Sequence, residues 1–173
     1  NSAIEKTIVF TWKSDTTPPV ITCPSLTSTQ SFGRVCSYTQ GGWGAEPNGG
    51  NPGMILSNNF NTVYPGGFVE VGISGSGNSM KFTSSTAIKN YLPAGSTAGA
   101  LTTDYVNPLT TSAGVFGGQV LALQLNVDFS DAGVIGGSIG SFGNLVLNDA
   151  TSPVNGKSVR DILGLANQAL GGA

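Results

Sequence analysis

The chain has 173 residues, of which only 9% are charged, and its formal net charge is −2. The seven Lys and Arg residues are scattered, which argues against a nucleic-acid-binding protein, because phosphate contacts need grouped basic side chains. No apolar run approaches the roughly 18 residues of a membrane-spanning helix, so no membrane span is expected. With so few charges, the polar groups that contact water must come from Ser, Thr, Asn and backbone amides. Neighbouring copies of the chain would also repel one another little.

Residues 1–13 alternate like a half-buried β-strand. One face of this strand carries Ile4, Lys6, Ile8, Phe10 and Trp12, and the other carries Glu5, Thr7, Val9, Thr11 and Lys13. The Pro18-Pro19 pair ends the extended segment, because proline cannot donate to a strand ladder. No hairpin turn and no partner strand follow directly. We therefore expect an extended arm over residues 1–22, a strand with a Pro-rich linker, whose sheet lies elsewhere.

Cys23 and Cys36 lie close together in the sequence, at the start of the segment 23–173 that we expect to be globular. In an extracellular setting they are expected to form one disulfide around a short loop, contributing roughly 3 kcal/mol to stability. Two buried thiols are the alternative. A redox site would need a C-x-x-C spacing, which the sequence does not have.

The segment 39–53 is rich in glycine and predicts turns. A short helix is predicted over 53–62, and residues 68–73 and 79–83 flank a five-residue loop and predict a β-hairpin. A second helix is expected to begin at Ser84 or Ser85 and to end at Pro93. The Thr/Ser/Gly-rich stretch 94–112 shows little periodicity and predicts a loop.

The run 118–129 fits two structures, because its leucines alternate like a strand but also align on one helical stripe. Periodicity alone leaves Gln119–Val127 open between helix and strand. The last segment is clearer: Ser158 caps an amphipathic helix that ends at Gly171-Gly172. Its inward residues are predicted to be Val159, Ile162, Leu163, Ala166 and Leu170, and its outward residues Arg160, Asp161, Asn167 and Gln168. The fold class is α+β: a small globular domain with several helices and a short β-hairpin, plus the N-terminal strand arm.

The sequence offers little for catalysis or metal binding. Histidine, the commonest general base, is absent, and no serine lies in a G-x-S-x-G motif. Zinc would find two cysteines and no histidine. Asp128 and Asp131 are the close pair of acids, but Ca²⁺ takes about six to eight oxygen ligands, so a solvated helix end or turn is the favoured interpretation. We therefore expect no enzyme activity, no metal and no cofactor.

Aromatic residues near the glycine-rich segment suggest one binding role. The faces of Trp43, Tyr38 and Tyr64 suit stacking on a sugar ring, which makes Trp43 a candidate ligand-facing aromatic. Such residues more often pin a loop to the core, and this second interpretation is favoured.

Several motifs occur in an order that resembles a module of secreted, multidomain bacterial surface proteins. They are the T-Q-G-G-W-G run 39–44, the run 81–88, the Leu-Pro-x-Gly element 92–95, the run 113–129 and the closing helix 159–172. The resemblance implies a secreted or cell-surface location and a helix at Gln119–Val127, and the family brings no assigned chemistry. Residues 10–24, with D-x-x-P-P at their centre, resemble the junction between hyaline repeats, which are immunoglobulin-like sandwiches.

Together these observations favour a structural subunit of an extracellular filament or surface assembly. Its strand would be donated to a neighbouring copy, head to tail, through Ile4, Ile8, Val9, Phe10 and Trp12. The alternative is a monomeric cell-surface adhesion or carbohydrate-binding module that recognises surface glycans near Trp43.

Overall fold

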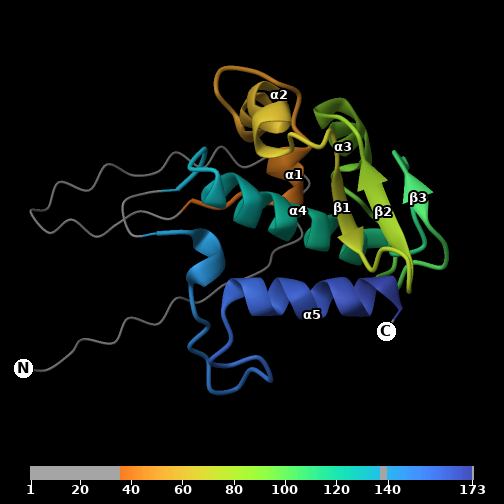
Figure 1. Cartoon of the computed structure of the whole chain (residues 1–173), viewed down its shortest axis with the longest axis vertical. Helices are drawn as coiled ribbons and strands as arrows, with labels where there is room; N and C mark the ends of the chain where they lie inside the picture. Colours follow the sequence, from red (N-terminus) through yellow and green to blue (C-terminus); the bar gives the residue numbers. More distant parts are fainter. Residues whose placement is uncertain (1–35, 137–139, 173) are drawn as a thin grey trace, which may run out of the picture.

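The computed structural model describes residues 36–136 and 140–172. This part of the chain has the predicted α+β fold, with helices around a small sheet. Figure 1 shows α4 running through the middle of the domain, with the sheet at one end of it, α2 and α3 on one side and α5 on the other. The arm 1–22, the interface residues Ile4, Ile8, Val9, Phe10 and Trp12, and Cys23 all lie outside the described residues. The Cys23–Cys36 disulfide therefore stays a prediction.

The first two helices follow capping residues that the sequence supplies. The short helix α1 (Gln40–Trp43) begins after Thr39, whose hydroxyl accepts a hydrogen bond from the Gly42 amide. The helix α2 (Pro52–Val63) begins after Asn51, whose Oδ1 accepts from the Met54 amide at 2.9 Å. Proline is favoured in a first helical turn, where its missing N–H costs nothing. The predicted helix over 53–62 is confirmed, with Pro52 as its first residue.

The predicted hairpin is also confirmed. The strands β1 (Val69–Gly72) and β2 (Ser79–Phe82) pair antiparallel, with Val71 opposite Met80. A third strand, β3 (Tyr105–Val106), lies parallel to β2, so the order within the described sheet is β1-β2-β3.

The prediction of a loop over 94–112 missed β3. Two residues are too few to show a period, and side chains hold this strand in place. Asp104 Oδ1 accepts from the Ser79 amide and Asn107 Oδ1 accepts from the Thr83 amide, each at 2.8 Å.

The run left open between helix and strand is helical, within α4 (Gly114–Asp131). Because this helix is buried on most of its sides, its leucine, valine and phenylalanine residues are not confined to one stripe. Apolar and other residues therefore happen to alternate along the sequence as they would in a strand. The buried residues include Val120, Leu121, Leu125, Val127 and Phe129. The helix α3 (Ser85–Tyr91) is capped by Ser84, whose Oγ accepts from the Ala87 amide at 3.1 Å. A single 3-10 turn, η1 (Phe142–Asn144), follows α4.

The last helix, α5 (Val159–Gly171), has the expected ends. Ser158 and Asp161 form a reciprocal capping box, and Gly172 has a φ of 87°, which glycine adopts readily. Leu163 and Leu170 are buried as predicted. The prediction that Asn167 points outward is wrong, because its side-chain oxygen accepts a 2.7 Å hydrogen bond from the Gly72 amide. Asn167 thereby joins α5 to β1.

One apolar cluster runs from Trp43 in α1 to Leu170 in α5 and includes side chains from every layer. Its largest fully buried members are Trp43, Phe82 and Phe129. Within residues 36–136 and 140–172, no helix combines the length and hydropathy needed to cross a membrane.

Candidate functional sites

Trp43 lies inside the core and does not face a ligand. Its side chain is 0% exposed, and its ring packs against Tyr38 and Phe129, with centroids 5.2 and 4.9 Å away. Its Nε1 donates to Asn126 Oδ1 at 3.2 Å. The interpretation of Trp43 as an exposed sugar-stacking residue is therefore corrected, because a ring without exposed surface cannot stack on a ligand. Trp43 pins the glycine-rich segment to α4.

A small hollow borders this segment where α1, α2 and α3 meet. Its volume is about 130 Å³, below the roughly 300 Å³ at which ligand pockets usually begin. Lys89 and Glu46, which both line the hollow, form an ion pair of 2.5 Å. The hollow is therefore too small for a carbohydrate site of ordinary size.

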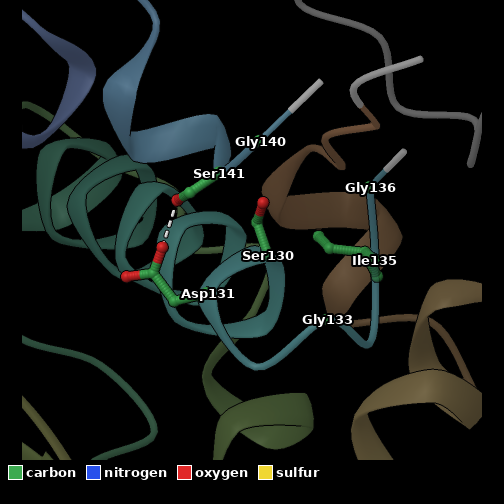
Figure 2. A pocket seen from close by; sticks show the side chains of 7 residues that line it. All are labelled: Ser130, Asp131, Gly133, Ile135, Gly136, Gly140 and Ser141. Carbon is green, nitrogen blue, oxygen red and sulfur yellow. Dashed lines mark hydrogen bonds between the residues drawn. The ribbon is translucent and has the colours of Figure 1, made fainter. Parts of the chain in front are cut away.

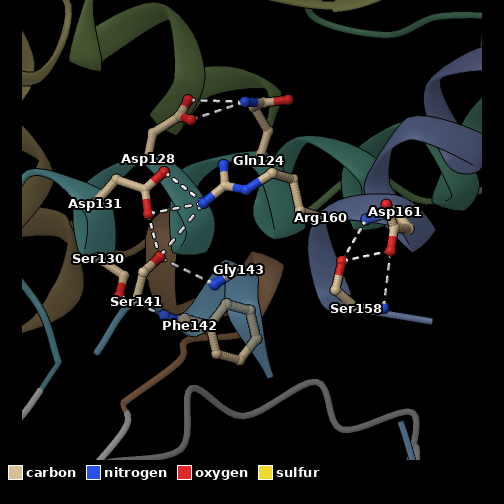
Figure 3. A network of polar contacts seen from close by, with 10 residues as sticks. All are labelled: Gln124, Asp128, Ser130, Asp131, Ser141, Phe142, Gly143, Ser158, Arg160 and Asp161. Carbon is tan, nitrogen blue, oxygen red and sulfur yellow. Dashed lines mark hydrogen bonds and ion pairs between the residues drawn. The ribbon is translucent and has the colours of Figure 1, made fainter. Parts of the chain in front are cut away.

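The carboxyl end of α4 carries a polar network (Figure 3). The Arg160 guanidinium of α5 lies 2.9 Å from a carboxylate oxygen of Asp131, and the Ser141 hydroxyl donates to the same carboxylate. The Ser141 oxygen in turn accepts from the Gly143 amide, and Ser130 Oγ accepts from the Phe142 amide at 2.8 Å. These bonds tie α4, η1 and α5 together.

Asp128, one turn before Asp131, faces different partners. Its Oδ2 accepts from the Tyr64 hydroxyl at 2.8 Å. Both of its oxygens lie 2.9 Å from the Gln124 amide nitrogen, as Figure 3 shows. Burial raises the pKa of Asp128, although the hydrogen bonds from Gln124 and Tyr64 act in the opposite direction. Burial, together with the nearby Asp128 charge, also raises the pKa of Tyr64, which therefore stays a hydrogen-bond donor.

The two aspartates therefore do not converge on one point. Asp131 is exposed, as expected for a solvated helix end, whereas Asp128 is half-buried. Among the described residues, no three His, Cys, Asp or Glu side chains are grouped closely enough to hold a metal ion. Every buried side-chain nitrogen or oxygen in this part of the chain has a hydrogen-bond partner. The hydrogen bonds and the ion pair of this network hold α4, η1 and α5 against one another.

An open depression of about 510 Å³ lies beside this network (Figure 2). It is lined by Ser130, Asp131, Gly133, Ile135, Gly136, Gly140 and Ser141. Its hydroxyls and carboxylate are the groups already bonded in the network, and Ile135 is its single large apolar side chain. The chain between Gly136 and Gly140 lies outside the described residues, so no ligand is assigned to the depression.

The surface near β3 carries two exposed apolar side chains that the sequence analysis missed. Val106 is 67% exposed and Leu109 is 68% exposed. Across the sheet, Phe68 is 41% exposed, and its ring lies 4.4 Å from the Lys81 ammonium. Val106 and Leu109 flank Pro108 in a stretch otherwise rich in Thr and Ser, and this was the signal available in the sequence.

No protein-family model matches the chain, and no curated protein and no solved structure matches it either.

Asp128→Asn is expected to gain stability relative to the unmodified protein as the pH rises above 3.8. Because the pKa of Asp128 is raised on folding, the folded protein keeps a proton that the unfolded chain releases, and it loses stability as the pH rises through the raised pKa. Asparagine does not titrate, and its oxygen can still accept from Tyr64. Urea unfolding of both proteins across this pH range measures the difference.

Asp149→Asn is the matched control, with the opposite sign. Hydrogen bonds from Thr151 lower the pKa of Asp149, so its contribution to stability is present above the ordinary pKa and is lost as the pH falls. The free energy of unfolding of this variant minus that of the unmodified protein should therefore become more negative as the pH rises. A difference for Asp128→Asn that stays flat or falls would contradict the burial argument.

Proposed function

We propose that this chain is a secreted structural subunit that assembles head to tail by donating its N-terminal strand to a neighbouring copy. Strand donation obtains affinity from main-chain hydrogen bonds and specificity from alternate side chains. Ile4, Ile8, Val9, Phe10 and Trp12 are the proposed contacts, and each large apolar side chain contributes about 1.5–3 kcal/mol if fully buried. A contact of this kind does not close on itself unless it forms a ring, so an open filament is the expected product.

The observation that carries this proposal is the core of the described domain. One continuous apolar cluster extends from Trp43 to Leu170 and joins all the layers of the fold. Within the described residues the domain has a core of its own, which supports a proposal that assigns the apolar segment 1–13 to a partner outside that core. The low content of charged residues supports the same conclusion, because closely packed copies would repel one another little.

The alternative function, glycan binding near Trp43, is not proposed. It depended on an aromatic face open to solvent, and the Trp43 ring has none. The hollow beside it holds only about 130 Å³.

The proposal predicts that the two faces of the strand respond differently to charge. Ile8→Asp combined with Phe10→Asp should abolish concentration-dependent assembly in sedimentation velocity and remove filaments from electron micrographs, because a carboxylate would have to be desolvated in the contact. Thr7→Asp combined with Thr11→Asp places the same charges on the opposite face, where Val9 is the one proposed contact, and should therefore weaken assembly much less.

Circular dichroism should show that both variants keep the folded domain. A full-length chain that is monomeric at every concentration would contradict the proposal. So would a melting temperature of the Ile8→Asp/Phe10→Asp chain far below that of the control when both are measured at a concentration at which the control is monomeric, because the strand would then belong to its own domain.

A further inference from the structure

Among the described residues, β3 pairs with β2 on one side and with no strand on its other side. Its Asn107 amide donates to the Lys81 carbonyl at 2.8 Å, and Val106 lies in register with Lys81. In a parallel pair, one residue of a register pair bonds to the two residues that flank its partner. Here Lys81 bonds to a neighbour of Val106, so the N–H and C=O of Val106 itself point away from β2. Figure 1 shows β3 as the outermost strand of the sheet. An edge of this kind is a template for another strand.

Apolar side chains accompany this edge. Val106 and Leu109 are the most exposed large hydrophobic side chains among the described residues, at 67% and 68%. Most of the other large apolar side chains in the domain are buried or half-buried. Exposed apolar groups beside an open edge indicate an interaction surface, because their burial would add to the main-chain bonds.

The edge is also held rigidly. Asn107 Nδ2 donates to Thr83 Oγ1 at 2.8 Å, and Asp104 Oδ1 accepts from the Ser79 amide, so both ends of β3 are fixed to β2. Pro108 has no N–H and ends the ladder after Val106. The main-chain contact is therefore short, and the side chains of Val106 and Leu109 must provide much of the binding.

Charge on the outer face of the sheet favours one occupant. Glu70 and Asp104 are acidic, whereas Lys81 is the basic residue among them, 3.8 Å from Glu70. The apolar face of the strand 1–13 carries one charge, that of Lys6. A basic residue between apolar anchors complements an apolar edge with an excess of acid.

We infer that the β3 edge, with Val106 and Leu109, is the surface that receives the strand 1–13 of a second copy. This inference rests on the proposed function and adds the acceptor to it. Each subunit would then carry both a donor strand and an acceptor edge. This heterologous arrangement produces head-to-tail growth.

Val106→Asp and Leu109→Asp in the full-length chain test the acceptor. Each should weaken assembly in sedimentation velocity by at least about tenfold in the dissociation constant, because a charge would replace a buried aliphatic group. Val146→Asp is the matched control, since Val146 is 61% exposed and lies in an isolated bridge with Ser158 at the start of α5. It should assemble like the unmodified chain.

The outcomes separate the acceptor from the donor. If the Ile8→Asp/Phe10→Asp chain fails to assemble but Val106→Asp and Leu109→Asp assemble normally, the acceptor is wrong while strand donation stands. An unmodified chain that never assembles overturns both. If Val106→Asp is monomeric and melts well below monomeric Val146→Asp, the edge receives its own strand, which also overturns the inference.

Discussion

Trp43→Ala is expected to lower the free energy of unfolding by about 3–5 kcal/mol, the range found for removing large buried aromatic side chains. The ring is 0% exposed and touches Tyr38 and Phe129, so its removal leaves a cavity that rigid neighbours cannot fill. The variant also loses the donor to Asn126 Oδ1. Urea unfolding followed by circular dichroism measures the change.

Two further variants test whether the loss of stability in Trp43→Ala comes from the buried ring. Phe68→Ala removes an aromatic ring that is 41% exposed, and it should cost about 1 kcal/mol or less. Trp43→Phe keeps most of the apolar volume but not the hydrogen bond, so it should fall between the other two. A loss for Trp43→Ala as small as that for Phe68→Ala would contradict the role of Trp43 as a core residue.

Asn126 shows what makes the Trp43 position specific. Its Oδ1 accepts from the Tyr38 amide at 2.8 Å as well as from Trp43, and its Nδ2 donates to the Tyr38 carbonyl at 2.8 Å. One buried amide on α4 therefore fixes two residues more than eighty positions earlier. Polar groups buried in this way are costly unless fully bonded, so they select one packing of the segment.

The elements with local signals were predictable from the sequence. Ser158 and Asp161 indicate the start of α5, and Asn51 followed by Pro52 indicates the start of α2, because a cap bonds to residues within one turn of itself. The β1–β2 hairpin has alternation on both sides of a short loop. By contrast, β3 depends on Asp104 and Asn107 bonding to a strand about 25 residues earlier, which no local pattern reveals.

The polar network was only partly predictable. The spacing of Asp128 and Asp131 places both near one end of α4, and this much follows from helical geometry. Their partners come from distant segments, since Tyr64 lies 64 positions before Asp128 and Arg160 lies 29 positions after Asp131. The sequence favoured a solvated helix end or turn over a calcium site, and tertiary packing gives each carboxylate its own donors. Side chains that meet only after folding cannot be assigned from periodicity.

Gly44→Ala is expected to destabilise the domain by at least about 2 kcal/mol, within the usual range for overpacking. A Cβ at Gly44 would lie 2.2 Å from the Leu92 carbonyl oxygen and 2.5 Å from its carbon. These are backbone atoms at the end of α3, so relief requires α1 and α3 to separate rather than a side chain to turn. Thermal and urea unfolding measure the loss.

Gly41→Ala, three residues earlier in the same T-Q-G-G-W-G segment, is the matched control. Its Cβ would meet only Thr39 Oγ1, at 3.9 Å, and alanine is favoured over glycine in a helix by about 0.5–1 kcal/mol. This variant should therefore be neutral or slightly more stable. Equal losses at the two positions would mean that glycine serves flexibility throughout the segment, whereas a loss at Gly44 alone assigns it to the close approach of the segment to Leu92.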